Sequence, residues 1–192
     1  MNASALYDFV FRGLLTEEAL DKAGRRSSVF IDATTDELRG ALSFELLDPD
    51  QLAAAVKMGI VYSAIASFEN SARRFVSKVL ADQHGETWWA TKVSEKIRTA
   101  AEGRQEDEAK TLWHGRRGDS PMNYTELGDL PKIIQQNWDD FEPYVRRVDW
   151  ATSIYASVER SRNVIMHSGV LDVEDVERLG MNIRDWIKQV GS

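Results

Sequence analysis

Apolar residues in this chain recur mainly three and four positions apart, which is the periodicity of an amphipathic helix. The strongest run follows Asp48-Pro49, a capping acid followed by a proline that suits a first helical turn. We therefore expect a long helix from Pro49 to about Ala81. Its heptad-like seam, suited to bundle packing or to a two-chain interface, consists of Ala54, Met58, Val61, Ile65, Phe68, Ala72, Phe75 and Val79.

The remaining pattern is also helical, and no sustained alternation of apolar and polar residues predicts a strand. Further helices are expected over Ala3 to about Lys22, Trp88 to about Ala101, Gln105 to Trp113, Thr125 to about Asn137, Val148 to the stop at Ser168-Gly169, and after the capping residue Asp172. An exposed loop over Gly115–Pro121 and a break at Pro143 separate some of them. The prediction is an all-α protein with an N-terminal helical extension over residues 1–48 and a helical domain over residues 49–192.

Composition narrows the class of protein. With 43% hydrophobic and 29% charged residues, the chain can bury a sizeable core. It has no cysteine, which excludes disulfides, thiolate metal sites and a cysteine nucleophile, and agrees with a reducing cytosol. The N-terminus lacks a leader pattern, and no stretch approaches the roughly 18 apolar residues of a spanning helix. We expect a cytoplasmic protein without a membrane span.

The formal net charge of −7 argues against a broad electrostatic grip on nucleic acid. This net charge is compatible with a small RNA-cutting site, because such a site needs only a few cations around one phosphate. The chain also lacks a histidine pair at metal-ligand spacing, a serine-hydrolase elbow and a phosphate-binding loop, so we expect neither a metal nor a cofactor.

The sharpest chemical feature is Arg162-Asn163-Val164-Ile165-Met166-His167. At about 100° per residue, Arg162 lies at the edge of the apolar stripe and His167 about 140° away from it. One ideal helix cannot direct both side chains to one point. Either the helix unwinds before His167, or another element, such as a second copy of the chain, completes the pair.

The long helix offers Arg162 a partner in Glu69, which also stands four residues before Arg73 in the favourable order for an ion pair. Two interpretations stay open for Glu69 and Arg73. They form either an ordinary surface pair within the helix or a support for the site around Arg162.

The motif resembles that of the HEPN superfamily of helical ribonucleases and nucleotide-binding domains. In that family an arginine precedes a histidine by four to six intervening residues, and a polar residue often follows the arginine; Arg162, Asn163 and His167 match. A long helix with Phe68-Glu69-Asn70 precedes the motif, and Tyr124–Leu130 lies between. The arrangement is most similar to the branch named after a transcript quality-control endonuclease, and the resemblance covers about residues 49–190.

The resemblance implies a homodimer in which the motifs of both chains meet across a twofold axis and cut RNA without a metal. Such chemistry must deprotonate the 2′-hydroxyl, protonate the leaving 5′-oxygen and stabilise the phosphorane. His167 suits proton transfer near neutral pH, and Arg162 can direct two donors to a phosphate. Asn163 would orient the histidine or donate to phosphate, and Glu69 would hold Arg162. The expected products carry 2′,3′-cyclic phosphate and 5′-hydroxyl ends.

Other cationic and aromatic residues are weaker candidates. Arg116, Arg117 and Arg160 are candidate RNA contacts, although charged residues of this kind are more often plain solvated surface. The six tryptophans could stack on bases, but most fall on apolar stripes and are expected in the core.

The leading hypothesis is a toxin or phage-defence ribonuclease, with RNA, a second copy and a neutralising or regulatory protein as partners. The rivals are a HEPN-like module that binds RNA or a nucleotide without cutting it, and a helical scaffold dimer.

Overall fold

A computed structural model of the chain describes Thr16 and residues 34–191. The described part consists of helices and turns and contains no strand, so the all-α prediction is confirmed. Except for Thr16, which is helical, the helix expected over Ala3–Lys22 lies outside the described residues. The chain divides into two compact units, residues 1–48 and residues 49–192, which are considered separately.

In the first unit, the described residues form helix α2 (Thr35–Ala41) and the 3₁₀ turn η1 (Phe44–Leu46). Helix α2 was not predicted, although Thr34 followed by Asp36 and Glu37 is a typical helix start. The Thr34 hydroxyl accepts from the Glu37 amide, and the Glu37 carboxylate accepts from the Thr34 amide at 2.7 Å. This reciprocal capping box begins the helix and holds the pKa of Glu37 below its usual value.

The second unit is organised on α3 (Pro49–His84), which begins at the predicted proline and ends one turn later than expected. Most of the predicted seam is buried or half-buried against the rest of this unit. The buried residues of α3 are Met58, Ile65, Phe68, Ala72, Val76, Val79 and Leu80. At about 1.5 Å per residue, this helix is about 54 Å long and provides one wall for nearly every later element.

The N-terminal half of α3 corrects the expectation that no segment has the length and apolarity of a membrane span. An 18-residue window within Pro49–Lys92 has a mean hydropathy of 1.3, which suffices by length and composition alone. Only 11% of that window is buried. Alanines between the seam residues raise the average hydropathy, and Ile60 lies 72% exposed on the outer face. The helix therefore combines a core-forming half with a half that leaves apolar surface exposed.

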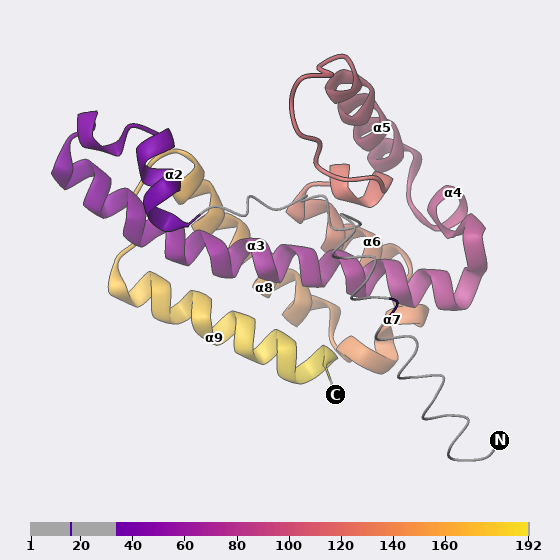
Figure 1. The fold of residues 1–192 in the computed structure, drawn as a ribbon. Coiled ribbons are helices and arrows are strands. Elements are labelled where there is room, and N and C mark those ends of the chain that lie inside the picture. The colour runs from indigo at the N-terminus through magenta and orange to yellow at the C-terminus, as the bar shows by residue number, and fades with distance from the viewer. Residues whose placement is uncertain (1–15, 17–33, 192) are drawn as a thin grey trace. The chain divides into compact units, whose positions relative to one another are not determined.

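The later elements follow in chain order. They are η2 (Gly85–Thr87), α4 (Trp88–Lys92), α5 (Glu95–Ala109), η3 (Pro121–Tyr124), η4 (Leu127–Asp129), α6 (Leu130–Gln136), α7 (Trp138–Val145), α8 (Val148–Met166) and α9 (Val173–Val190). Helices α8 and α9 pack against each other and against α3, and α5 stands apart from this layer and contacts η3 (Figure 1). The starts predicted for α8 and α9 are confirmed; the Asp172 side chain accepts from the Asp175 amide.

The boundaries between α4 and α6 differ from the prediction. The helix expected over Trp88–Ala101 is interrupted because Val93 adopts an extended conformation and is itself buried. Helix α5 then runs without a break through Gln105, which was expected to begin a separate helix. Thr125 does not begin a helix either. It is buried between η3 and η4, where its hydroxyl donates to the Met122 carbonyl.

Pro143 does not break the chain as predicted, because it lies inside α7. A proline there removes only the one amide that would donate to the carbonyl four residues earlier, and Asp139 is exposed. The break comes at Arg146, whose φ of 61° lies in the left-handed region.

The core of this unit is centred on Trp186 of α9, which is fully buried. Its indole ring contacts aromatic rings from both neighbouring helices: Phe68, Phe75, Trp150 and Tyr155. Burial also raises the pKa of the Tyr155 phenol. One indole thus joins α3, α8 and α9.

We expect Trp186→Ala to destabilise the fold by about 3–5 kcal/mol, because it leaves a cavity where three helices meet. Urea unfolding followed by circular dichroism measures the change. Ile187→Ala, at the neighbouring and exposed position, is the matched control and should stay within about 0.5 kcal/mol of the native protein. Equal effects of the two substitutions would contradict a core centred on Trp186.

Candidate functional site

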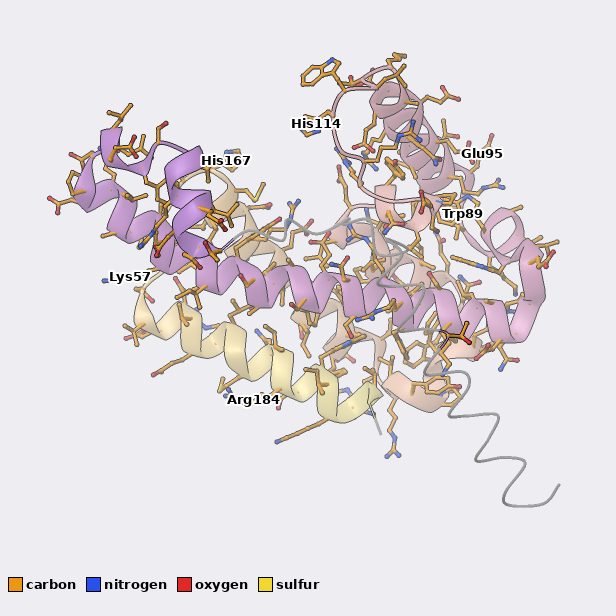
Figure 2. The ribbon with its side chains drawn as sticks, viewed as in Figure 1. Lys57, Trp89, Glu95, His114, His167 and Arg184 are labelled. Carbon is orange, nitrogen blue, oxygen red and sulfur yellow. The ribbon has the colours of Figure 1, made fainter. Side chains whose placement is uncertain are left out.

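Helix α8 carries the arginine and histidine motif and stays regular to its end. Its last helical residue is Met166, and His167 is the capping residue, whose amide donates to the Asn163 carbonyl at 3.2 Å. Figure 2 shows His167 at this end of α8. The helix therefore does not unwind before His167, and the first of the two predicted ways to unite Arg162 with His167 is absent from the described chain.

The stop predicted at Ser168-Gly169 is confirmed, and its geometry is a Schellman motif. Ser168 adopts a left-handed conformation with φ 61°, and its amide donates to the Ile165 carbonyl at 2.9 Å. The Gly169 amide donates to the Val164 carbonyl at 2.8 Å. A Cβ on Gly169 would lie 2.8 Å from that same carbonyl oxygen, so the tight turn behind His167 requires glycine.

Glu69 of α3 lies between two arginines. Its Oε1 is 2.5 Å from Arg73 Nη2, and its Oε2 is 3.6 Å from Arg162 Nε. Arg73 Nη2 also donates to the Thr125 carbonyl at 2.9 Å. Because the Glu69 side chain is only 12% exposed, this cluster is more than a solvated pair within one helix. It joins α3, the turn between η3 and η4, and α8.

Arg162 and His167 line two different hollows. The first, here called the Arg162 groove, has a volume of about 780 Å³, and the charged or amide side chains in it include Glu69, Arg73, Arg117, Arg162 and Asn163. The second, the His167 hollow, is shallower, and its polar residues are Glu159, Arg160, Asn163 and His167.

The structure thus brings most predicted residues together in two groups that meet at Asn163. Arg117 reaches the Arg162 groove and Arg160 the His167 hollow, whereas Arg116 is exposed and lines neither. Arg162 and His167 themselves do not share a hollow within one chain.

Glu159 was missed by the sequence analysis, although it borders both hollows. The signal was available: Glu159, Asn163 and His167 are spaced four residues apart, so they follow one face of α8. A Cβ on Gly128 would lie 2.9 Å from Glu159 Oε1, so the glycine in η4 makes room for the carboxylate. Within the described residues, Glu159 forms no ion pair.

Arg104 of α5 is a second residue that the sequence analysis missed. It lines the Arg162 groove and donates to the Tyr124 carbonyl and to Glu126, each at 2.8 Å. A lone arginine on a polar helix gives no signal of this role, because its position depends on how α5 folds back on η3.

Tyr124 anchors the loop that carries Arg117. Its hydroxyl donates to Glu108 Oε2 at 2.7 Å, and the Arg117 guanidinium lies 6.0 Å from its ring centre and 3.5 Å from Glu108. The hydrogen bond from the phenol lowers the pKa of Glu108 and raises that of Tyr124. The same loop exposes 86% of Trp113, the exception among tryptophans that otherwise are buried or half-buried as predicted.

His84 is not a plain surface histidine. Its Nε2 lies 2.7 Å from Asp140 Oδ2, and both side chains are largely buried, so the pair joins the end of α3 to α7. Among the residues that the structure describes, no group of three or more histidine, aspartate or glutamate side chains could hold a metal ion.

We expect Gly169→Ala to lower stability by more than about 1 kcal/mol and to shift the NMR signals of the His167 ring, because the added methyl group meets the Val164 carbonyl. Ser168→Gly at the neighbouring left-handed position should instead gain up to about 1 kcal/mol and leave those signals in place. If Gly169→Ala left both quantities unchanged, the turn would not position His167.

The pKa of Glu108 predicts a pH dependence. Because the folded-state pKa is lowered, the interaction stabilises the fold above the ordinary glutamate pKa and is lost as the pH falls through the lower folded value. Tyr124→Phe removes the phenolic donor, so the variant should lose less stability than the native protein over this acidic range. Thermal unfolding of both proteins across that range measures the difference, and parallel curves would contradict the prediction.

Comparison with known proteins agrees with this organisation. The family model for Swt1-like HEPN domains matches residues 63–191, about two thirds of the chain. The search of curated proteins found no match, and neither did that of solved structures. The matched span includes Glu69, Arg73 and the whole of α8, and HEPN domains are nuclease-like helical modules. The chain therefore belongs to the HEPN superfamily, in its Swt1-like family.

Proposed function

We propose that this protein is a metal-independent endoribonuclease that works as a homodimer, with an arginine and histidine site built from both copies. The observation that carries the proposal is the arrangement on α8. Arg162 and His167 line separate hollows that join at Asn163, so each chain presents both catalytic groups without bringing them together.

The charges around Arg162 suit the binding of one phosphate. Glu69 forms ion pairs with both Arg73 and Arg162. Two guanidinium groups beside one carboxylate leave a net positive charge at this place. The Arg162 side chain is 34% exposed, so its remaining donors can reach a ligand. Asn163, at the junction, can donate to the same phosphate or orient an imidazole, and His167 supplies proton transfer.

An apolar surface beside the motif is suited to docking a second copy of the chain. A hollow of about 630 Å³ lies between the N-terminal half of α3 and the end of α8, and Met58, Tyr62, Ile165, Met166 and Val170 supply its largest apolar side chains. Met166 and Val170 are more than half exposed, which is typical of surfaces that bind another protein. Tyr62 also lines the Arg162 groove, so a copy docked on this surface would stand next to that groove.

The biological role that we propose is a cytoplasmic toxin or antiviral effector. An RNA-cutting site that needs no metal is active whenever it is assembled, so a neutralising or regulatory protein would have to control assembly or access. The exposed apolar surface beside the motif is where such a protein could prevent dimerisation.

Cleavage of mixed RNA in the presence of a chelator tests the chemistry. The native protein should generate 2′,3′-cyclic phosphate ends, and His167→Ala and Arg162→Ala should each lower the rate by about 10²–10⁴-fold. His114→Ala and Arg184→Ala change the same residue types at exposed positions outside both hollows and should cleave normally.

Mixing the two inactive variants tests the shared site. A dimer of one Arg162→Ala chain and one His167→Ala chain retains one arginine and one histidine on opposite copies, so part of the activity should return. A monomeric mass, or association with lipid vesicles in place of dimerisation, would contradict the shared site. Tight RNA binding without cleavage would support a non-catalytic module, and neither binding nor cleavage would support a scaffold.

A further inference from the structure

A third hollow extends the site away from the motif. It has a volume of about 940 Å³ and is lined by residues that include Arg74, Lys78 and Trp88. It shares Asn70, Arg73 and Asn123 with the Arg162 groove, which in turn shares Glu159 and Asn163 with the His167 hollow. The three hollows thus form one path along α3 to the end of α8, here called the α3 track.

The charge of the α3 track is opposite to that of the whole chain. The whole chain has 24 basic and 31 acidic residues. Among the residues that the structure describes, seven basic and three acidic ones line the track. The lining therefore carries a formal charge of +4, whereas the chain carries −7. The basic residues are Arg73, Arg74, Lys78, Arg104, Arg117, Arg160 and Arg162, and the acidic residues are Glu69, Glu126 and Glu159.

The basic residues at the two ends of the track differ in ion pairing from those in its middle. Arg73, Arg104 and Arg162 are held by glutamates, which fixes the walls of the Arg162 groove. Within the described residues, Arg74, Lys78 and Arg160 form no ion pair, and all three are exposed. Such cations can each release counterions on meeting a phosphate.

The spacing of Arg74 and Lys78 adds a second argument. They stand four residues apart on α3, where two like charges lie side by side and disfavour the helix. A bound phosphate between them would remove this repulsion. Asn70, four residues before Arg74, supplies an amide group that can hydrogen-bond base edges along the same path. Asn123 of η3, whose Oδ1 accepts from the Ser120 amide, can offer its NH₂ group as a donor.

We propose that the α3 track binds the RNA strand on one side of the scissile phosphate, and that its occupant is single-stranded RNA. A single strand can follow a path that passes through three connected hollows and can present its unstacked bases to side-chain amides. In-line attack by the 2′-hydroxyl also requires a backbone free to rotate, which a paired A-form helix restricts. The inference rests on the proposed ribonuclease function and assigns the substrate-binding surface of that site.

The test measures binding of a short, fluorescein-labelled, mixed-sequence single-stranded RNA to the full chain carrying His167→Ala, so that the probe stays intact. Adding Arg74→Gln and Lys78→Gln removes two phosphate contacts. At about 0.7 released counterions per contact, the slope of log K against log salt should fall by about 1.4, and affinity at about 0.1 M salt should fall roughly 25-fold.

The matched control is Arg184→Gln with Lys188→Gln in the same His167→Ala background. These two residues are also basic, exposed and four apart, and both belong to α9, where Figure 2 labels Arg184. Helix α9 lines none of the three hollows in the described chain. The control removes the same charge and should leave slope and affinity near those of the parent. If both double variants lost the same RNA affinity, the loss would be a general effect of charge, and the proposal that the α3 track binds RNA would be overturned.

Two further outcomes separate the track from the proposed function. If the native protein cuts no RNA while the parent binds it and the track variant does not, the track stands as a surface that binds single-stranded RNA, and the ribonuclease proposal fails. If the native protein cuts RNA while binding is insensitive to Arg74 and Lys78, the track fails and the ribonuclease proposal stands. A duplex of the same sequence bound as tightly as the single strand would overturn the assignment to single-stranded RNA.

Discussion

The site depends on one nearly buried carboxylate, that of Glu69. Burying a carboxylate to 12% exposure is costly without nearby cations, and Arg73 and Arg162 supply them from α3 and α8. The Arg73 contact to the Thr125 carbonyl extends the cluster to the turn between η3 and η4. Three segments separated in sequence are thereby held at the same place, and the excess positive charge remains beside the groove.

The helical geometry of α8 is the second constraint on the site, because it decides on which face of the helix each motif residue lies. A regular helix places residues four apart on one face and residues five apart on different faces, so Glu159, Asn163 and His167 line up while Arg162 faces α3. The Schellman turn after His167 fixes the helix end and prevents the histidine from swinging toward the arginine groove by local unwinding. Arg162 and His167 of one chain therefore line separate hollows. In the proposed homodimer, the exposed apolar surface that includes Met166 and Val170 would bring the arginine of one copy to the histidine of the other.

Much of this architecture could be predicted from the sequence, because long amphipathic helices and their caps are local features. Asp48-Pro49, Asp172 and Ser168-Gly169 each predicted a correct helix boundary. The helical angle of about 100° per residue correctly predicted that Arg162 and His167 face apart. The errors fall where tertiary packing overrides local signals. Val93 is buried in an extended conformation, Thr125 is buried in a turn, and Pro143 lies within a short helix. Arg104 and Asn123 reach the groove only because α5 packs against η3 and η3 packs against α3, which no local pattern encodes.

The acidity of the chain is consistent with the proposed RNA track. Outside the track, the protein carries an excess of acidic residues, which repels a polyanion from the rest of the surface. At physiological salt, charge is screened over roughly 8 Å, so a strand senses mainly the nearest lining. In the proposed function, the positive track would therefore guide RNA to Asn163 and both hollows of α8, and the negative surface would limit unspecific binding elsewhere. The net charge of −7, which argued against a nucleic-acid-coating protein, is thus compatible with one that admits RNA along a single route.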